Sequence, residues 1–357
     1  QSTAYPSQSD TNLENYQITP RINIINDFLN KELKSTYGLD LQFADYGSDR
    51  KKNKDVAPLH VYNASQHTQS VYAQHEIKLN KNFTLGTGLR IQRNDITIKD
   101  RLDRGAVNYT SYDIEHDNYA KQEINYAYNF GLGYDVSSRI NVFSRFGSGF
   151  RYANIDDRIG GSGSTSFDLN TQKTLDYEIG VNFNTKKMES KIITYVIDSK
   201  NEIAYDADNY VNYNLSNTRR VGLELYLKNK FNKKISMTNS LTFVKAKFTS
   251  NPNTENWNST VYNSSRQIKG NDIPLVPNFS FDSNLDLKVN DYLTILPSLK
   301  YQDDMRMEND EENFQNTKIP GYLLFNIGAQ SKFKKFLIFL NVNNIFDEKY
   351  FNYAVSS

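Results

Sequence analysis

Histidine is the scarcest of the chemically versatile side chains in this sequence. Only four occur, and none lies in the last two-thirds of the chain: His60, His67, His75 and His116. His60 and His67 flank a segment that we expect to be a long loop, where an imidazole can bind a metal chelate or can simply be solvated. No Gly-x-Ser-x-Gly motif and no convincing Ser-His-acid set occurs. We therefore predict no catalytic residues and no enzyme.

Carboxylates gather in two polar segments of the chain. Their oxygens can bind calcium, but the spacing is not that of an EF-hand. Solvated loop charge is the alternative that we favour. Cysteine is absent, which excludes thiolate ligands and disulfides. We predict no metal site and no cofactor for this chain. The carboxylates concerned are Asp303, Asp304, Glu308, Asp310, Glu311 and Glu312 in one segment and Asp113, Glu115 and Asp117 in the other.

Arginine and tyrosine are the remaining candidates for binding a solute. A guanidinium group carries a fixed, planar charge that suits anions, and a phenol ring can stack on a ligand. The same side chains can instead pin the base of a loop or pack within it. The net charge is +1, so no overall field favours nucleic acid. The residues concerned are Arg145, Arg151, Arg158, Arg219 and Arg220, with Tyr109, Tyr112, Tyr205, Tyr210 and Tyr213.

The elements that must position these side chains are predicted to be β-strands. In 175–184, LDYEIGVNFN, every second residue from Leu175 to Phe183 is apolar, and the residues between are polar or glycine. Segments 221–231 and 279–289 alternate in the same way, and a period of two is typical of a strand. About fourteen such segments of about 11–14 residues occur, longer than ordinary soluble strands. Their approximate spans are 20–30, 36–46, 68–80, 82–95, 122–136, 138–151, 173–186, 188–199, 220–232, 234–249, 276–290, 291–303, 320–332 and 334–346.

The connections between these segments alternate strictly between short and long. Short turns such as 79–82 are followed by loops at 47–67, 95–121, 152–172, 199–219, 250–275 and 304–319. An antiparallel up-and-down transmembrane β-barrel has this asymmetry. Aromatic residues make up 13% of the chain, with 25 Tyr and 21 Phe, and would form girdles at the two membrane interfaces. The alternative is aromatic packing in a large soluble β-core.

Several motifs, read in order, resemble the barrel of a TonB-dependent outer-membrane receptor. SRFGSGFR (144–151) is similar to the family's Phe-Arg signature, and LDYEIGVNF (175–183) to its Tyr-Glu-hydrophobic-Gly strand. NTRRVGLEL (217–225) and IPLVPNFSF (273–281) resemble two further strand motifs, and NVNNIFDEKYF (341–351) resembles the passage before the last strand. Over 1–140 the resemblance lies in the strand pattern more than in motifs.

The resemblance implies a partial barrel over 1–357. A family member has a plug domain and about 22 strands, so we expect the plug, the early strands and the last strand to be absent from this chain. It implies a monomeric active transporter in the outer membrane of a Gram-negative bacterium. Its partners would be outer-membrane lipid and, through the plug, TonB. No bond chemistry is expected.

The resemblance also implies a substrate class. We expect a ferric siderophore or other iron chelate, with cobalamin or another nutrient as an alternative and a passive porin as a second alternative mechanism. Heme is disfavoured, because loop 152–172 lacks histidine and has Tyr152-Ala153 where the family usually has Ala-Pro. The candidate ligand-binding residues in the long outer loops are Arg151, Arg158, Tyr205, Tyr210 and Arg219.

An incomplete barrel should be unable to insert stably by itself. An open sheet edge in lipid leaves backbone groups without hydrogen-bond partners. We therefore expect the isolated chain 1–357 to show no heat-modifiable migration on gels, the usual sign of a folded barrel. A folded band that shifts on boiling would contradict this expectation.

Overall fold

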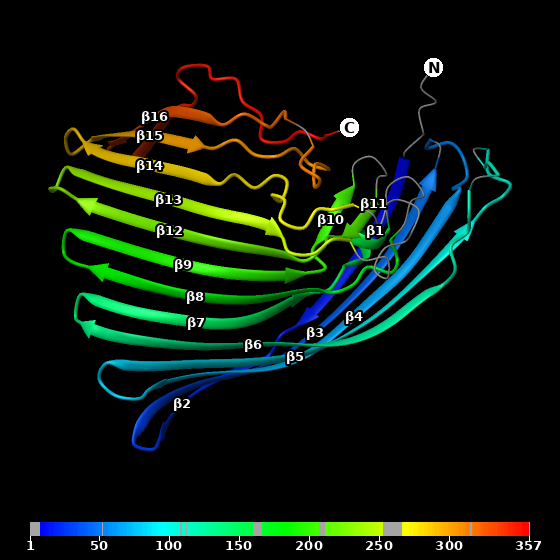
Figure 1. Cartoon of the computed structure of the whole chain (residues 1–357), viewed down its shortest axis with the longest axis horizontal. Helices are drawn as coiled ribbons and strands as arrows, with labels where there is room; N and C mark the ends of the chain where they lie inside the picture. The colour runs from blue at the N-terminus through cyan, green and yellow to red at the C-terminus, as the bar shows by residue number, and fades with distance from the viewer. Residues whose placement is uncertain are drawn as a thin grey trace.

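The computed structural model describes residues 8–51, 53–107, 109–111, 113–159, 166–206, 211–252, 266–314 and 316–356. Most of them form one strongly curved antiparallel sheet, with tight turns at one end and long loops at the other (Figure 1). The first strands are β1 (Gln8–Ile18), β2 (Arg21–Phe28), β3 (Lys31–Lys51), β4 (His60–Lys78), β5 (Phe83–Leu102), β6 (Tyr119–Ser137), β7 (Ile140–Arg151), β8 (Gln172–Asn184) and β9 (Met188–Lys200). The remaining elements are α1 (Ile155–Arg158), β10 (Ile203–Asp206), β11 (Val211–Asn214), β12 (Thr218–Lys230), β13 (Ile235–Phe248), β14 (Phe279–Lys288), β15 (Leu293–Gln302), β16 (Tyr322–Phe333) and β17 (Phe336–Val342).

The predicted all-β, antiparallel up-and-down architecture is confirmed. Each predicted segment corresponds to one strand of the wall, β2–β9 or β12–β17, and short turns alternate with long connections as expected. Among the described residues no pairing joins β17 at one edge to β1 or β2 at the other, so the barrel wall is open. In the part of the chain that the structure describes, no helix is long and apolar enough to cross a membrane.

The sequence pattern missed β1 and the hairpin of β10 and β11. β1 and β2 pair with successive parts of β3, with Ile18 opposite Leu41 and Arg21 opposite Gly38. They are interrupted at Pro20, which lacks the N–H that a continuous ladder needs. The β10–β11 hairpin is not part of the wall sheet. It forms a separate two-stranded sheet within the connection from β9 to β12.

The predicted loops 47–67 and 95–121 were too long. β3 continues to Lys51, β4 begins at His60, and β5 continues to Leu102. In these extensions the outer-face residues are mostly polar, and in β5 the apolar side chains Ile96 and Ile98 lie on the luminal face. The apolar and polar faces are thus exchanged there, while the backbone ladder continues without interruption. Only about 9–11 residues of a strand are needed to cross a bilayer. The loop ends of these strands therefore extend beyond the membrane-spanning part.

Strand register assigns the wall side chains to two faces. One face carries ion pairs between Arg90 Nη1 and Asp40 Oδ2 at 2.6 Å and between Arg145 Nη2 and Asp176 Oδ2 at 2.9 Å. The opposite face is an exposed apolar belt. Because the long connections pack against the polar face, we assign that face to the lumen and the apolar face to lipid. The belt includes Val71, Leu89, Ile91, Tyr126, Tyr128, Phe130, Tyr177, Ile179, Val221 and Leu223.

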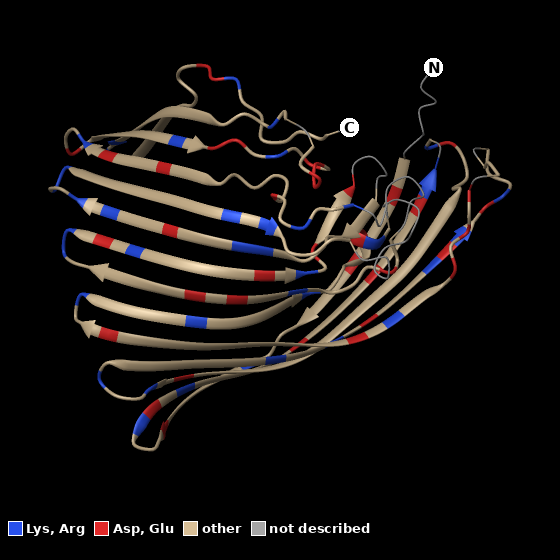
Figure 2. Ribbon diagram, in the orientation of Figure 1, with Lys and Arg blue, Asp and Glu red and all other residues tan. Residues whose placement is uncertain are grey.

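Charged side chains mark the two rims of the wall. Figure 2 shows Lys and Arg at the tight turns, opposite the end that carries the long loops. Lys or Arg lies in or directly beside each of these turns, as in KKM (186–188) and KFKKF (332–336). Such side chains can reach headgroups while their stems cover apolar surface.

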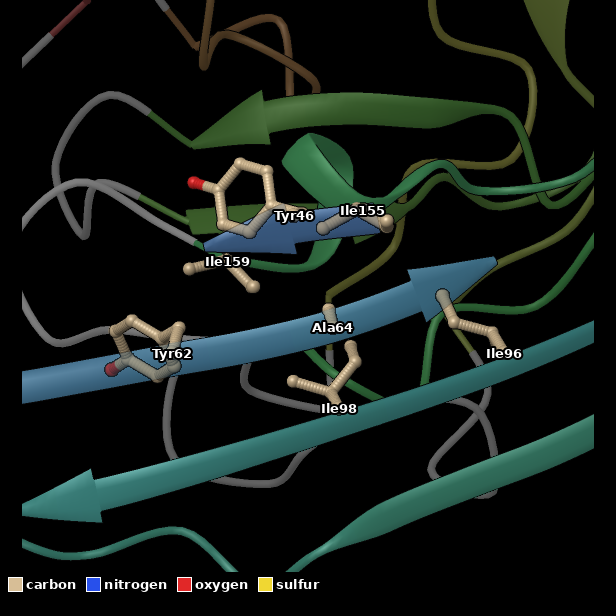
Figure 3. Packing of buried hydrophobic residues seen from close by; sticks show 7 residues of the cluster. All are labelled: Tyr46, Tyr62, Ala64, Ile96, Ile98, Ile155 and Ile159. Atoms are coloured by element: carbon tan, nitrogen blue, oxygen red, sulfur yellow. The ribbon is translucent and has the colours of Figure 1, made fainter. Parts of the chain in front are cut away.

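The main core lies where the connection after β7 folds back onto the loop ends of β3, β4 and β5. Ile155 and Ile159 of the α1 segment, by which we mean α1 with its C-cap residue Ile159, pack against apolar side chains of these strands (Figure 3). Burial of this surface stabilises the connection over the lumen, at about 25 cal/mol per Å² of apolar area. The strand residues of this core are Tyr46, Tyr62, Ala64, Ile96 and Ile98.

Gly321, just before β16, should not tolerate a side chain. A Cβ there would lie 2.8 Å from the carbonyl oxygen of Gln302 and 3.0 Å from the amide nitrogen of Asp304, and backbone atoms cannot move aside cheaply. We expect Gly321→Ala to lower the free energy of unfolding by about 1–3 kcal/mol. Urea unfolding of the intact protein from micelles measures this difference. Gly47→Ala is the matched control, because a Cβ there meets nothing within 4 Å, and equal losses in both variants would contradict the account.

Candidate functional site

Arg151 ends β7 on the luminal face, which it shares with Arg145 by strand alternation. Its Nη2 lies 2.8 Å from Asp157 Oδ2 of α1, and 47% of its side chain remains exposed. Asp157 also closes a capping box with Asn154 at the start of α1. Arg151 therefore braces the α1 segment while keeping part of its guanidinium group open to the lumen.

Arg158, by contrast, is fully buried at the end of α1. Its Nη1 donates to the carbonyl oxygen of Phe167 and, at 3.4 Å, to the Tyr119 hydroxyl, and its guanidinium carbon lies 5.5 Å from the centre of the Tyr119 ring. Burial lowers the pKa of Arg158. In this conformation the side chain joins the α1 segment to β6 and does not face solvent. Its predicted role in ligand binding stays a prediction.

The predicted tyrosines are divided between described and undescribed parts of the chain. Tyr205 lies on β10 with 42% of its surface exposed. Tyr210 and Tyr112 lie outside the described residues. The β10–β11 hairpin that carries Tyr205 contacts the α1 segment, where Asn212 Nδ2 donates to the carbonyl oxygen of Asp157 at 2.9 Å. The hairpin that carries Tyr205 therefore adjoins the α1 segment, with which Arg151 forms its ion pair.

Arg219 and Arg220 point to opposite faces of β12. Arg219 shares its face with exposed Val221 and Leu223, and its Nε lies 2.6 Å from Asp198 Oδ1. Arg220 lies on the luminal face, where its Nη1 and Nη2 donate to the two oxygens of Glu202 at 2.7 and 2.8 Å. The structure therefore places Arg219 on the outer face, apart from Arg151 and Tyr205.

The Arg220–Glu202 pair should make stability depend on pH. Burial alone would raise the pKa of Glu202, but hydrogen bonding and charge from Arg220 and a hydrogen bond from Thr218 outweigh it, so the pKa is lowered. A lowered folded-state pKa stabilises the protein above the unfolded value, about 4.3, and this contribution is lost as pH falls through the folded-state pKa.

Glu202→Gln should therefore lower the free energy of unfolding at pH 7 by about 1–3 kcal/mol. The difference from the wild type should narrow as the pH falls below about 4. Thermal unfolding of the intact protein in detergent from pH 3 to pH 8 follows both quantities. Asp198→Asn, at the more exposed Arg219 pair, is the control and should lower the free energy of unfolding by less than about 1 kcal/mol. If the effect of Glu202→Gln does not change with pH, this explanation is wrong.

The acidic segment 303–312 differs from the expected solvated charge. Asp310 and Glu311 are buried, and Arg306 Nη1 lies 3.2 Å from Asp310 Oδ2. Arg266 Nε lies 2.7 Å from Glu312 Oε1. The interpretation as solvated charge was wrong for these residues, because the loop folds inward and its carboxylates pair with arginines. Tyr213 on β11 also donates to Glu311 Oε1 at 2.6 Å, which joins the hairpin to this loop.

The structure brings together two histidines that the sequence did not pair. His60 is a buried residue of β4, so its expected loop position was wrong. Its Nδ1 lies 2.9 Å from Asp100 Oδ1 on β5, and His116 Nδ1 lies 2.9 Å from Asp100 Oδ2. His67 is instead at an edge-to-face contact with Phe43 on the other face of β4. Sequence reasoning missed Asp100, because β5 was expected to end before it.

The environment of Asp100 keeps its carboxylate ionised. Burial would raise the pKa of Asp100, but hydrogen bonds from the side chains of His116 and His60 and from the backbone N–H of His116 outweigh it, and the pKa is well below its usual range. Asp100 lies near the loop end of β5, outside the membrane-spanning part. Ligand atoms of the three side chains lie within 4.8 Å of one another, close enough for one metal ion.

Comparison with known proteins identifies relatives of the wall as a whole. A family model described as TonB dependent receptor-like, beta-barrel matches residues 1–345. No curated protein matches the chain. Many solved structures do, including the closed form of the ferric-catecholate import receptor Fiu from E. coli K12, with a TM-score of 0.75 and 15% identity over 97% of this chain and 52% of that one.

Two further structures are similar to the same extent. The siderophore receptor PiuA from Acinetobacter baumannii has a TM-score of 0.75 and 15% identity, over 97% of this chain and 54% of that one. The copper transporter OprC has a TM-score of 0.74 and 14% identity, over 98% and 53%. At these identities the likeness shows the fold. The chain spans about half the length of each of these structures.

Proposed function

We propose that this chain forms part of an outer-membrane transporter that imports an iron chelate. The chain belongs to the TonB-dependent receptor-like β-barrel family. Members of this family are receptors and transporters of the bacterial outer membrane. The observation that carries the proposal is the family match over residues 1–345. A wall with an outward apolar belt and a polar lumen is consistent with it.

The proposed substrate is a ferric siderophore or a similar anionic iron chelate. Structurally similar proteins include receptors for ferric catecholate and ferric yersiniabactin, a ferric citrate transporter and a copper transporter. In this chain the partly exposed side chain of Arg151 can donate charge-assisted hydrogen bonds to an anion, and the exposed ring of Tyr205 can stack on the ligand. Arg158 and Tyr210 remain proposed contributors from the same connections, whereas Arg219, on the outer face, is proposed to change uptake by less than about twofold.

The proposed mechanism is energised import without bond chemistry in the barrel. On the luminal side the β10–β11 hairpin contacts both the α1 segment and the 303–321 connection. They would capture the chelate, and TonB would then act through a plug domain to open the path. The partners proposed are thus TonB, the chelate and outer-membrane lipid, and the transporter would work as a monomer.

A growth experiment tests this function. The host strain, deleted for the gene, is grown under iron limitation with one ferric siderophore at a time as the iron source. We expect growth to fail on at least one anionic chelate and to return when the intact gene is restored. Normal growth on every chelate would contradict the iron assignment. If the deletion strain fails to grow only when it depends on external cobalamin, the same mechanism would import cobalamin instead.

A further inference from the structure

A side-chain cluster at the loop end of the wall has no part in the proposed transport step. His60 begins β4, Asp100 lies near the end of β5, and His116 lies in the connection before β6. The register places Asp100 opposite Tyr62, so Asp100 and His60 are diagonal neighbours on the luminal face. The start of one strand, the end of the next and a loop therefore meet at this cluster.

We propose that His60, Asp100 and His116 bind one divalent transition-metal ion, such as Zn²⁺, which fastens connection 103–118 to the wall. Two imidazoles and one carboxylate are a donor set that suits zinc, nickel and copper. Calcium prefers six to eight oxygen ligands and is not expected here. The ion would be a structural part of the receptor and not the transported solute.

The distances leave room for the ion after a small outward shift. His60 Nδ1 lies 2.9 and 3.0 Å from the two Asp100 oxygens, and His116 Nδ1 lies 2.9 Å from Oδ2. Tetrahedral zinc with bonds of about 2.0–2.2 Å holds neighbouring ligand atoms about 3.3 Å apart. Each imidazole nitrogen thus needs to move only a few tenths of an ångström away from the Asp100 carboxylate, and all the ligand atoms already lie within 4.8 Å of one another. Each neutral imidazole would carry its proton on Nε2, which frees Nδ1 to bind the ion.

The burial of the cluster favours a built site over chance contact. The Asp100 side chain is 0% exposed and that of His60 is 5% exposed, whereas that of His116 is 28% exposed. His116 therefore marks the opening through which an ion and a water ligand could enter. The backbone N–H of His116 also donates to Asp100 Oδ2 at 3.0 Å and orients the carboxylate.

Aromatic rings enclose the cluster on two sides. The Tyr62 ring stacks on His60 at 5.6 Å with an interplanar angle of 2°, and the Phe167 ring lies 5.3 Å from that of His116. Phe167 belongs to the connection after β7, so that segment also covers the site. An ion bound here would order the connection before β6 and, through Phe167, the connection after β7.

Metal titration of the intact protein tests the proposal, which does not rest on the transport function. The protein is purified in detergent, stripped with a chelator, and titrated with Zn²⁺ or Ca²⁺ by calorimetry. We expect one Zn²⁺ per chain with a Kd of about 1 μM or lower, and no comparable Ca²⁺ binding. The double variant His60→Gln/His116→Gln should bind Zn²⁺ at least about 100-fold more weakly.

His67→Gln/His75→Gln is the matched control, since it removes the same number of imidazoles away from the cluster. It should retain the wild-type Kd, and an equal loss in both variants would overturn the proposal. If the ligand variant fails to fold, Cu²⁺ bound to the wild type decides by electron paramagnetic resonance. Hyperfine coupling to two nitrogens supports the site, and coupling to none or one, or no tight binding at all, overturns it.

Discussion

Uptake of the ferric chelate at low concentration should fall about 10-fold or more in the double variant Arg151→Ala/Tyr205→Ala. One charge-assisted hydrogen bond is worth about 1.5–3 kcal/mol, which corresponds to about 10–100-fold in affinity. Arg151 keeps nearly half of its side chain exposed at the lumen, and Tyr205 is exposed on the adjoining hairpin. Uptake of radioactive iron chelate, measured against chelate concentration, gives the apparent affinity directly.

Arg219→Ala is the control for this prediction. Arg219 has the same charge and also pairs with an aspartate, but it lies on the outer face of β12. Its variant should keep uptake within about twofold of the wild type, because a surface ion pair is worth little. If Arg219→Ala reduces uptake as much as the double variant does, the assignment of binding to the luminal face is wrong.

Asp100→Ala should lower the free energy of unfolding by about 3–5 kcal/mol, because it leaves buried donors without their acceptor. Asp100 accepts from the Nδ1 atoms of His60 and His116 and from the backbone N–H of His116. The variant should also release connection 103–118, seen as faster hydrogen exchange there than in the wild type. Urea unfolding of the intact protein from micelles and hydrogen exchange of the same sample measure the two effects.

Asp95→Ala separates this effect from a general loss of charge on β5. Asp95 lies on the same strand but faces outward, where its oxygens accept from Arg93 Nε at 2.8 Å and Nη2 at 3.0 Å. We expect it to cost under about 1 kcal/mol and to leave exchange in 103–118 unchanged. Similar losses in the two variants would show that the triad does not anchor the connection.

The wall of the fold was predictable because its signal is periodic. In β8, for example, one face carries Leu175, Tyr177 and Ile179 and the other carries Asp176 and Glu178. That alternation, together with turns of few residues, is sufficient to order the strands. The hairpin β10–β11 was missed, because its strands have four residues each, too few to establish a period.

The candidate site was harder to predict, because it depends on how far the strands extend. A hydrogen-bonded ladder can continue where the apolar and polar faces of a strand are exchanged, and β5 does so as far as Leu102. Only that extension brings Asp100 next to His60. The inward folding of the connections also depends on tertiary contacts, so sequence alone could not separate buried Arg158 from half-exposed Arg151.

The most direct test of the central claim is uptake of a radioactive ferric siderophore by cells carrying the intact protein, with and without a proton uncoupler. Deletion of tonB in the same host provides a second way to remove the energy input. The account predicts saturable uptake that is lost in both cases, with binding at the cell surface retained. Uptake that continues without the proton-motive force and rises linearly with concentration would contradict it and would identify a passive channel.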